Sequence, residues 1–94
     1  MQFIEGMVVR SMAGHDKNRF YVIVKIENES VFIADGKRRK VEDPKRKNPR
    51  HLHKTNTILT KAETETNRTL RRALHPFNYG SEENANTQGG NPLV

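Results

Sequence analysis

Apolar residues gather in a few short runs within the first 60 positions, and these runs predict β-strands. One run covers residues 6–12, where β-branched residues precede an alternation of polar and apolar positions. The strongest run covers residues 20–26. Its apolar and aromatic start predicts burial on both faces at that end. We place Val22, Val24 and Ile26 on the main core face of this strand.

A third strand is predicted at residues 31–34, between a polar hairpin connection and an Asp-Gly turn pair. Weaker strands are expected at residues 39–41 and 51–58. Between them, residues 42–50 contain two prolines and no large apolar residue, which predicts a stiffened loop held away from the body. Five short strands joined by tight turns favour a small, closed or nearly closed barrel over an open sheet.

A helix is predicted in the second part of the chain from one apolar stripe. Its members are spaced i, i+3, i+4 and i+7: Leu70, Ala73, Leu74 and Phe77. The residues that can cap its start are Thr64, Thr66 and Asn67. Pro76 is expected to end it near His75. The opposite face carries Arg68, Arg71 and Arg72. That face is either the wet side of a docked helix or an extension of a binding surface that orders only when bound. We expect docking, because so short a helix is marginal alone in water.

These patterns divide the chain into three parts. Residues 1–60 are expected to form the barrel, and residues 61–77 a linker with the amphipathic helix. Residues 78–94 are dominated by Gly, Asn, Ser, Thr, Gln and Pro, which predicts a disordered tail.

Composition narrows the classes of protein to consider. The chain has 94 residues, 17 Lys and Arg against 11 Asp and Glu, and no cysteine. The lack of cysteine excludes disulfides, thiolate catalysis and most structural zinc sites. No apolar run is long enough to span a bilayer, and the start lacks the pattern of a signal peptide. We therefore expect a soluble, cytoplasmic protein of a single domain, with no cofactor and no small-molecule substrate. We also expect it to be a monomer when it is not part of a larger assembly.

The excess charge lies in one part of the chain. Residues 1–60 carry 13 basic and 7 acidic side chains, a net charge of +6, whereas residues 61–94 carry four of each. Within residues 37–54, nine basic residues face two acidic ones, a net charge of +7. Such clustering predicts binding to a polyanion, because phosphate contacts release counter-ions. A nuclear-localisation signal or an anionic membrane surface uses similar charge but needs no barrel. The basic residues are Lys37, Arg38, Arg39, Lys40, Lys45, Arg46, Lys47, Arg50 and Lys54.

The first two predicted strands and their connection carry a family resemblance. The pattern Gly6-x-Val8-Val9-Arg10-Ser11-x-Ala13-Gly14-His15-Asp16, followed by residues 20–24, resembles a KOW motif, in which strand residues flank a glycine-centred turn. The continuation through Asp35-Gly36-Lys37-Arg38-Arg39 to His51-Leu52-His53-Lys54-Thr55 resembles the family of ribosomal protein fourteen of the archaeal and eukaryotic large subunit and its short bacterial relatives. The resemblance covers residues 3–55 and implies an SH3-like barrel that contacts ribosomal RNA. Asn18 stands where the family often has glycine, and asparagine tolerates the left-handed conformation.

The connection between the first two strands is the second expected RNA contact. Gly14 makes a tight turn possible and lets backbone N–H groups approach phosphate. Asp16 is expected to hydrogen-bond this turn rather than to do chemistry. The contacts expected here are Arg10, Gly14, His15, Lys17 and Arg19. His51 and His53 alternate along a predicted strand, where they pack or add partial positive charge beside a phosphate.

Other chemistries find less support in the residues. Phe20 and Tyr21 stack on an unpaired base or, as we favour, belong to the core. Without an RNP-type aromatic pair or a Gly-x-x-Gly clamp, we expect phosphate and shape contacts. The two histidines lack further ligands for a metal, and no nucleophile lies in a recognisable context, so we expect neither a metal site nor an enzyme.

We therefore expect a ribosome-associated RNA-binding protein, with ribosomal RNA as its main partner and ribosomal proteins as further partners. The alternative from a different class is a protein-interaction adaptor for the transcription or translation machinery. An adaptor would bind through an apolar surface at Phe20 and Tyr21 and use the basic patch as a rim.

Overall fold

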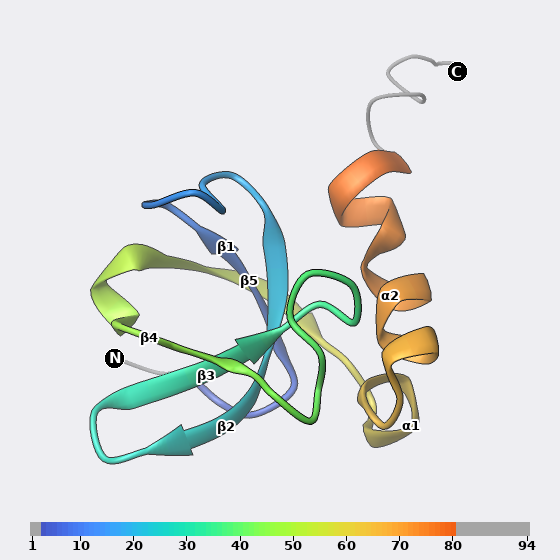
Figure 1. Cartoon of the computed structure of the whole chain (residues 1–94), viewed down its shortest axis with the longest axis horizontal. Helices are drawn as coiled ribbons and strands as arrows, with labels where there is room; N and C mark the ends of the chain where they lie inside the picture. The colour runs from blue at the N-terminus through green and yellow to red at the C-terminus, as the bar shows by residue number, and fades with distance from the viewer. Residues whose placement is uncertain (1–2, 81–94) are drawn as a thin grey trace.

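In the computed structural model, which describes residues 3–80, five antiparallel strands form one sheet (Figure 1). They are β1 (Met7–Ser11), β2 (Phe20–Glu27), β3 (Ser30–Ala34), β4 (Lys45–Lys47) and β5 (Leu52–Ile58). Their order is β4-β3-β2-β1-β5, so the two edge strands are consecutive in the chain. A short link containing the 3₁₀ turn η1 (Pro49–His51) joins these edges, which requires the sheet to curl. The predicted mainly β fold of about five strands followed by a helix is confirmed.

The fourth strand lies where the sequence predicted a loop. The strand expected at residues 39–41 is wrong, and the loop expected at residues 42–50 contains β4. The paired residues are Ile33 with Lys45, Phe32 with Arg46, and Val31 with Lys47. The two prolines of this segment flank β4, so all three of its residues keep a backbone N–H. The basic segment is therefore a sheet edge rather than a loop held away from the body.

The sheet buries apolar side chains on both faces. The inner face holds Met7, Val9, Tyr21, Ile23, Val31, Ile33 and Leu52. The outer face holds Val8, Val22 and Ala34, which pack with Leu59, Leu70 and Leu74. Two-sided burial at the start of β2 is thereby confirmed, since consecutive strand residues point to opposite faces.

The core face predicted for β2 is wrong at its far end. The register with β3 shifts between Ile23 and Lys25, so the alternation changes along the strand. Val24 is half-buried against the outer cluster, whereas Ile26 pairs with Val31 of the inner cluster and is 36% exposed. A bulge of this kind leaves little trace in the apolar pattern.

Two helices follow β5. The short α1 (Lys61–Thr64) begins after Thr60, and α2 (Asn67–His75) begins after Thr66; the two threonines both make capping boxes. Leu70 and Leu74 of α2 are buried against the outer face of the sheet, so the predicted docking is confirmed. No helix within residues 3–80 is long and apolar enough to cross a membrane.

The chain remains ordered beyond the predicted end of the helix. Residues Pro76–Gly80 form a π-helical turn, η2, in which the Asn78 side chain accepts a hydrogen bond from the Phe20 N–H (2.8 Å) and donates one to the Phe20 carbonyl (3.2 Å). Phe77 packs on the Phe20 ring with centroids 5.4 Å apart. The disordered tail predicted at residues 78–94 is therefore wrong at its start, and residues 81–94 lie outside the described part of the chain.

Candidate nucleic-acid interface

The connection between β1 and β2 is a compact turn built around a buried carboxylate. Gly14 has a φ of +85° and Asn18 a φ of +71°, so both take the left-handed conformation expected of them. Asp16 is 5% exposed and accepts a 2.9 Å hydrogen bond from the Ser11 hydroxyl. The interpretation of Asp16 as a residue that holds the turn together is confirmed.

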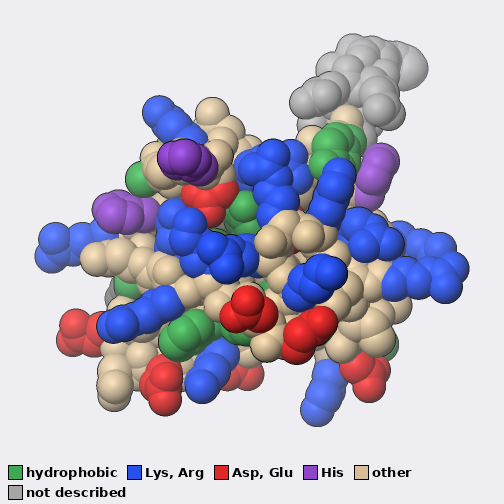
Figure 2. Space-filling model, viewed as in Figure 1, with side chains coloured by type: hydrophobic (Ala, Val, Ile, Leu, Met, Phe, Trp, Pro, Cys, Tyr) green, Lys and Arg blue, Asp and Glu red, His purple; other side chains and the backbone are tan. Residues whose placement is uncertain are grey.

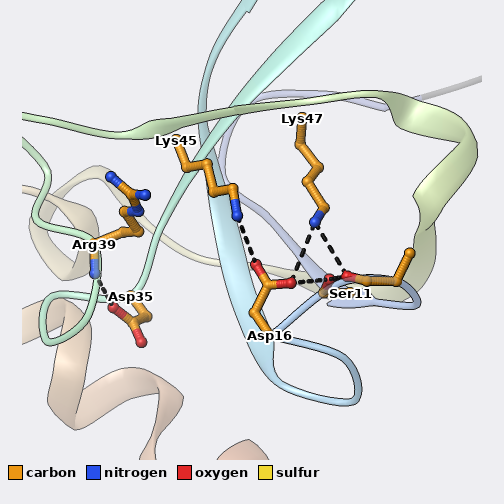
Figure 3. A network of polar contacts seen from close by, with 7 residues as sticks. Ser11, Asp16, Asp35, Arg39, Lys45 and Lys47 are labelled. Carbon is orange, nitrogen blue, oxygen red and sulfur yellow. Dashed lines mark hydrogen bonds and ion pairs between the residues drawn. The ribbon is translucent and has the colours of Figure 1, made fainter.

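Two lysines of β4 reach this carboxylate from the edge of the sheet (Figure 3). The Nζ atom of Lys47 lies 3.2 Å from Oδ1 of Asp16, and the Nζ atom of Lys45 lies 3.7 Å from Oδ2. Lys47 also donates to the carbonyl of Ala13 at 3.2 Å and is 9% exposed. Lys47 is therefore an internal residue, and Lys45 is half-buried beside it, although both were predicted in an exposed loop.

The hydroxyl and the lysines around Asp16 together outweigh the effect of burial on its carboxylate. Burial alone raises the pKa of Asp16, but hydrogen bonds from Ser11 and Lys47 and the charges of Lys47 and Lys45 outweigh it. The net result is that the pKa of Asp16 is lowered. The carboxylate is thus favoured in its ionised form beside the two lysines, and their contacts tie β4 to the β1–β2 connection.

The loop after β3 presents the densest basic run. The Asp35 carboxylate accepts 2.9 Å hydrogen bonds from the backbone N–H groups of Lys37 and Arg39, a pattern typical of an Asx turn. In return, the N–H groups of Asp35 and Gly36 donate to the Arg39 carbonyl at 2.9 and 3.0 Å. These hydrogen bonds hold the backbone of residues 35–39 in a tight turn. The exposed side chains of this loop are Lys37, Arg38 and Lys40, and Arg39 is half-buried.

The loop is also pressed against α2. Gly36 has a φ of +81°, and a Cβ built there would overlap the carbonyl oxygen of Asn67. The Arg71 guanidinium donates to the Gly36 carbonyl at 3.3 Å, and the Asn67 amide oxygen accepts from the Val41 N–H at 2.8 Å. The helix therefore fixes the position of the basic loop.

Tyr79 bridges two segments of the chain: the loop after β3 and the β1–β2 connection. Nη2 of Arg19 lies 3.2 Å from the Tyr79 hydroxyl oxygen, and Nζ of Lys37 lies 3.5 Å from it. The His75 ring is 5.0 Å from the Tyr79 ring. The pKa of Tyr79 is lowered, mainly by the hydrogen bond from Arg19 and to a smaller extent by the one from Lys37. The same bond to Tyr79 raises the pKa of Arg19.

The remaining predicted contacts lie at the surface in separate places. Arg46 is exposed on β4, and its Nε donates to Ser30 at 2.9 Å. Arg10 is half-buried and donates to Asn18 at 3.2 Å. The other exposed residues are Gly14, His15, Lys17, Arg50, His51, His53 and Lys54. Three of these, Arg50, His53 and Lys54, line a groove together with Phe3 and Leu52.

Exposed basic side chains lie on the loop after β3, on strand β4 and in the turn η1. We call Lys37, Arg38, Arg39, Lys40, Arg46 and Arg50 the basic face. Figure 2 shows Lys and Arg side chains in a band across the sheet, this loop and α2, while most Asp and Glu side chains lie below it. His51 ends η1 rather than sharing a strand with His53, and within residues 3–80 no three His, Cys, Asp or Glu residues are placed to hold a metal ion.

The aromatic surface expected for base stacking or for an adaptor is not exposed. Tyr21 is 1% exposed in the inner core, and burial raises its pKa. Phe20 is half-buried beneath Phe77 and Asn78. Tyr21 therefore belongs to the core, as we favour, and Phe20 is partly buried at the margin of the outer cluster.

Two residues near the basic face were missed in the sequence. Tyr79 was assigned to a disordered tail because its neighbours are polar, and Arg71 had no partner in the linear pattern. One signal for an ordered segment was present in the sequence: the aromatic residues Phe77 and Tyr79 directly after the helix. Aromatic side chains bury a large apolar area when they pack.

Comparison with known proteins adds no family to this description. No protein-family model matches the chain, and no curated protein matches it significantly.

Proposed function

We propose that the protein binds RNA through the basic face, with structured ribosomal RNA as the expected partner. The observation that carries the proposal is that the cations of residues 37–50, most of them exposed, stand on a loop, an edge strand and a turn rather than on a free loop. The loop after β3 is held by Asp35 and α2, and β4 is held by its pairing with β3 and by Asp16. Arginine and lysine side chains held in this way match the phosphates of a folded RNA without reordering the backbone.

The acidic side chains support the same proposal by their position. Asp16 and Asp35 are buried and engaged by lysines or by backbone N–H groups, so neither opposes an incoming phosphate at the surface. The neighbouring acidic residue Glu42 is turned to α2, where it accepts a 2.8 Å hydrogen bond from the Asn67 amide. That bond is the main cause of the lowered pKa of Glu42. Of the two acidic residues within residues 37–54, Glu42 is thus engaged by α2, while Asp43 is exposed.

The protein should recognise phosphate spacing and shape rather than base identity. The one fully buried aromatic ring of β2 belongs to the core, and the exposed groups of the basic face are guanidinium and ammonium groups. Such groups contact phosphates in any sequence. Association with ribosomal particles would place the protein in the cytoplasm.

Sedimentation of a cell lysate through a sucrose gradient tests the proposal. The protein should travel with large particles and should leave them after nuclease treatment. The charge-reversed pair Arg38→Glu and Arg39→Glu should sediment slowly without nuclease, while Lys61→Glu in α1 should behave as the unmodified protein. Sedimentation with large particles that survives nuclease would favour a protein partner and contradict the proposal.

A further inference from the structure

Two cations from distant parts of the chain converge on one oxygen atom. Arg19 is the last residue of the β1–β2 connection, and Lys37 lies in the loop after β3. Both donate to the hydroxyl oxygen of Tyr79, at 3.2 and 3.5 Å. The same cations lie over the ring, with Cζ of Arg19 5.4 Å and Nζ of Lys37 5.7 Å from its centroid. The position of the Tyr79 oxygen is thus a point of concentrated positive charge.

A phenol is a poor match for such a point. At neutral pH it is uncharged and offers one oxygen, whereas a phosphate offers negative charge and several oxygens. Donor capacity is also left over, because the buried Nε of Arg19 has no hydrogen-bond partner among residues 3–80. An arginine that presents Nε and Nη2 together can take an oxyanion in the bidentate manner that a single hydroxyl cannot satisfy.

The tyrosine is attached so that its side chain can leave without undocking the helix. The anchors of η2 are the residues before it: Asn78 bonds the Phe20 backbone and Phe77 packs on the Phe20 ring. Tyr79 follows these anchors, and its hydroxyl contacts are those to Arg19 and Lys37. Rotation of this one side chain, which would also end its 5.0 Å ring contact with His75, therefore frees the donor groups of Arg19 and of the already exposed Lys37.

We propose that Arg19 and Lys37 form a phosphate-binding subsite, which the Tyr79 hydroxyl occupies in the free protein and yields to a phosphate oxygen. The subsite rests on the proposed function, because the backbone of a bound RNA is the expected source of that phosphate. Free inorganic phosphate has the same chemistry and serves as a second probe. Through Arg19, the subsite would extend the basic face from Lys37 to the β1–β2 connection.

Binding of a structured RNA hairpin to Tyr79→Phe tests the exchange. Removal of the hydroxyl should tighten binding severalfold, because the cations no longer have to release it. In an Arg19→Ala background the same substitution should give no gain, and Arg19→Ala alone should weaken binding. Weaker binding by Tyr79→Phe would overturn the proposal, since the hydroxyl would then be part of the RNA contact.

Phosphate titration gives a readout that does not depend on RNA. The chain has two tyrosines, and Tyr21 is buried with a raised pKa, so Tyr79 should ionise first in an absorbance titration. Phosphate, compared with chloride at equal ionic strength, should move the pKa of Tyr79 up toward its ordinary value. An unchanged pKa in saturating phosphate would overturn the subsite.

The two experiments separate the subsite from the proposed function. If phosphate shifts the pKa of Tyr79 but no RNA binds, the subsite stands and the proposed function fails. If RNA binds equally well to the unmodified protein, Tyr79→Phe and Arg19→Ala, the proposed function stands and the subsite fails.

Discussion

Nζ of Lys47, on the edge strand β4, lies 3.2 Å from a carboxylate oxygen of Asp16, in the connection between β1 and β2. The two residues are 31 positions apart, and both are buried. Their contact joins one edge of the sheet to its first turn. The basic stretch of residues 37–54 therefore contains a lysine that supports the fold as well as the exposed cations of the basic face.

Loss of the buried ammonium should destabilise the protein. We expect Lys47→Met to lower the free energy of unfolding by about 2–3 kcal/mol, because Asp16 would keep its buried charge with only Lys45 near it. Lys40→Met, which removes an exposed lysine nearby, should change stability by less than about 0.5 kcal/mol. Urea unfolding followed by circular dichroism measures both. Equal stability of the two variants would contradict the structural role of Lys47.

The same ion pair predicts a particular dependence on pH. The lowered pKa of Asp16 means that the folded state prefers the ionised carboxylate. Its stabilisation is complete above the unfolded pKa, about 4, and is lost as the pH falls through the folded value. The stability gap between the unmodified protein and Asp16→Asn should therefore be largest near neutral pH and should shrink below pH about 4. Unfolding curves recorded over this range would refute the prediction if the gap stayed constant.

Two glycines with similar backbone angles should respond differently to alanine. Gly14 and Gly36 have φ values of +85° and +81°, so either substitution strains the backbone by about 1 kcal/mol. A Cβ at Gly14 meets only ordinary contacts, 3.6 Å from Asp16 and 3.7 Å from Lys47, whereas one at Gly36 overlaps the backbone of Asn67. Gly36→Ala should therefore cost more stability and also increase hydrogen exchange of the α2 amides. Equal losses for the two variants would show that the loop and α2 are not in tight contact.

The elements that the sequence predicts correctly have local signals. The apolar stripe of α2 and its proline end, the run that starts β2 and the glycine of the first turn all depend on residues within a few positions of each other. The chain alone is enough to place them.

The failures have a common physical cause, which is dependence on distant partners. A Lys-Arg-Lys segment between two prolines shows no strand pattern, because the burial of Lys47 depends on Asp16 and the pairing of β4 depends on β3. Charged edge strands of this kind also protect a sheet from aggregation, so polarity alone does not identify a loop. Tyr79 was missed for the same reason, since its partners lie 60 and 42 positions away.

The salt dependence of RNA binding reports how many phosphates the basic face contacts. If the six residues of the basic face supply about six phosphate contacts, the logarithm of the association constant should fall with the logarithm of salt concentration with a slope of about −4 to −5. Arg38→Ala and Arg46→Ala should each reduce the size of this slope by about 1, while Lys61→Ala in α1 should leave it unchanged. The account predicts this steep slope for the unmodified protein and its stepwise reduction in the variants. A slope near zero would contradict phosphate binding by the basic face. A steep slope that is unchanged by Arg38→Ala and Arg46→Ala would contradict the assignment of the contacts to these residues.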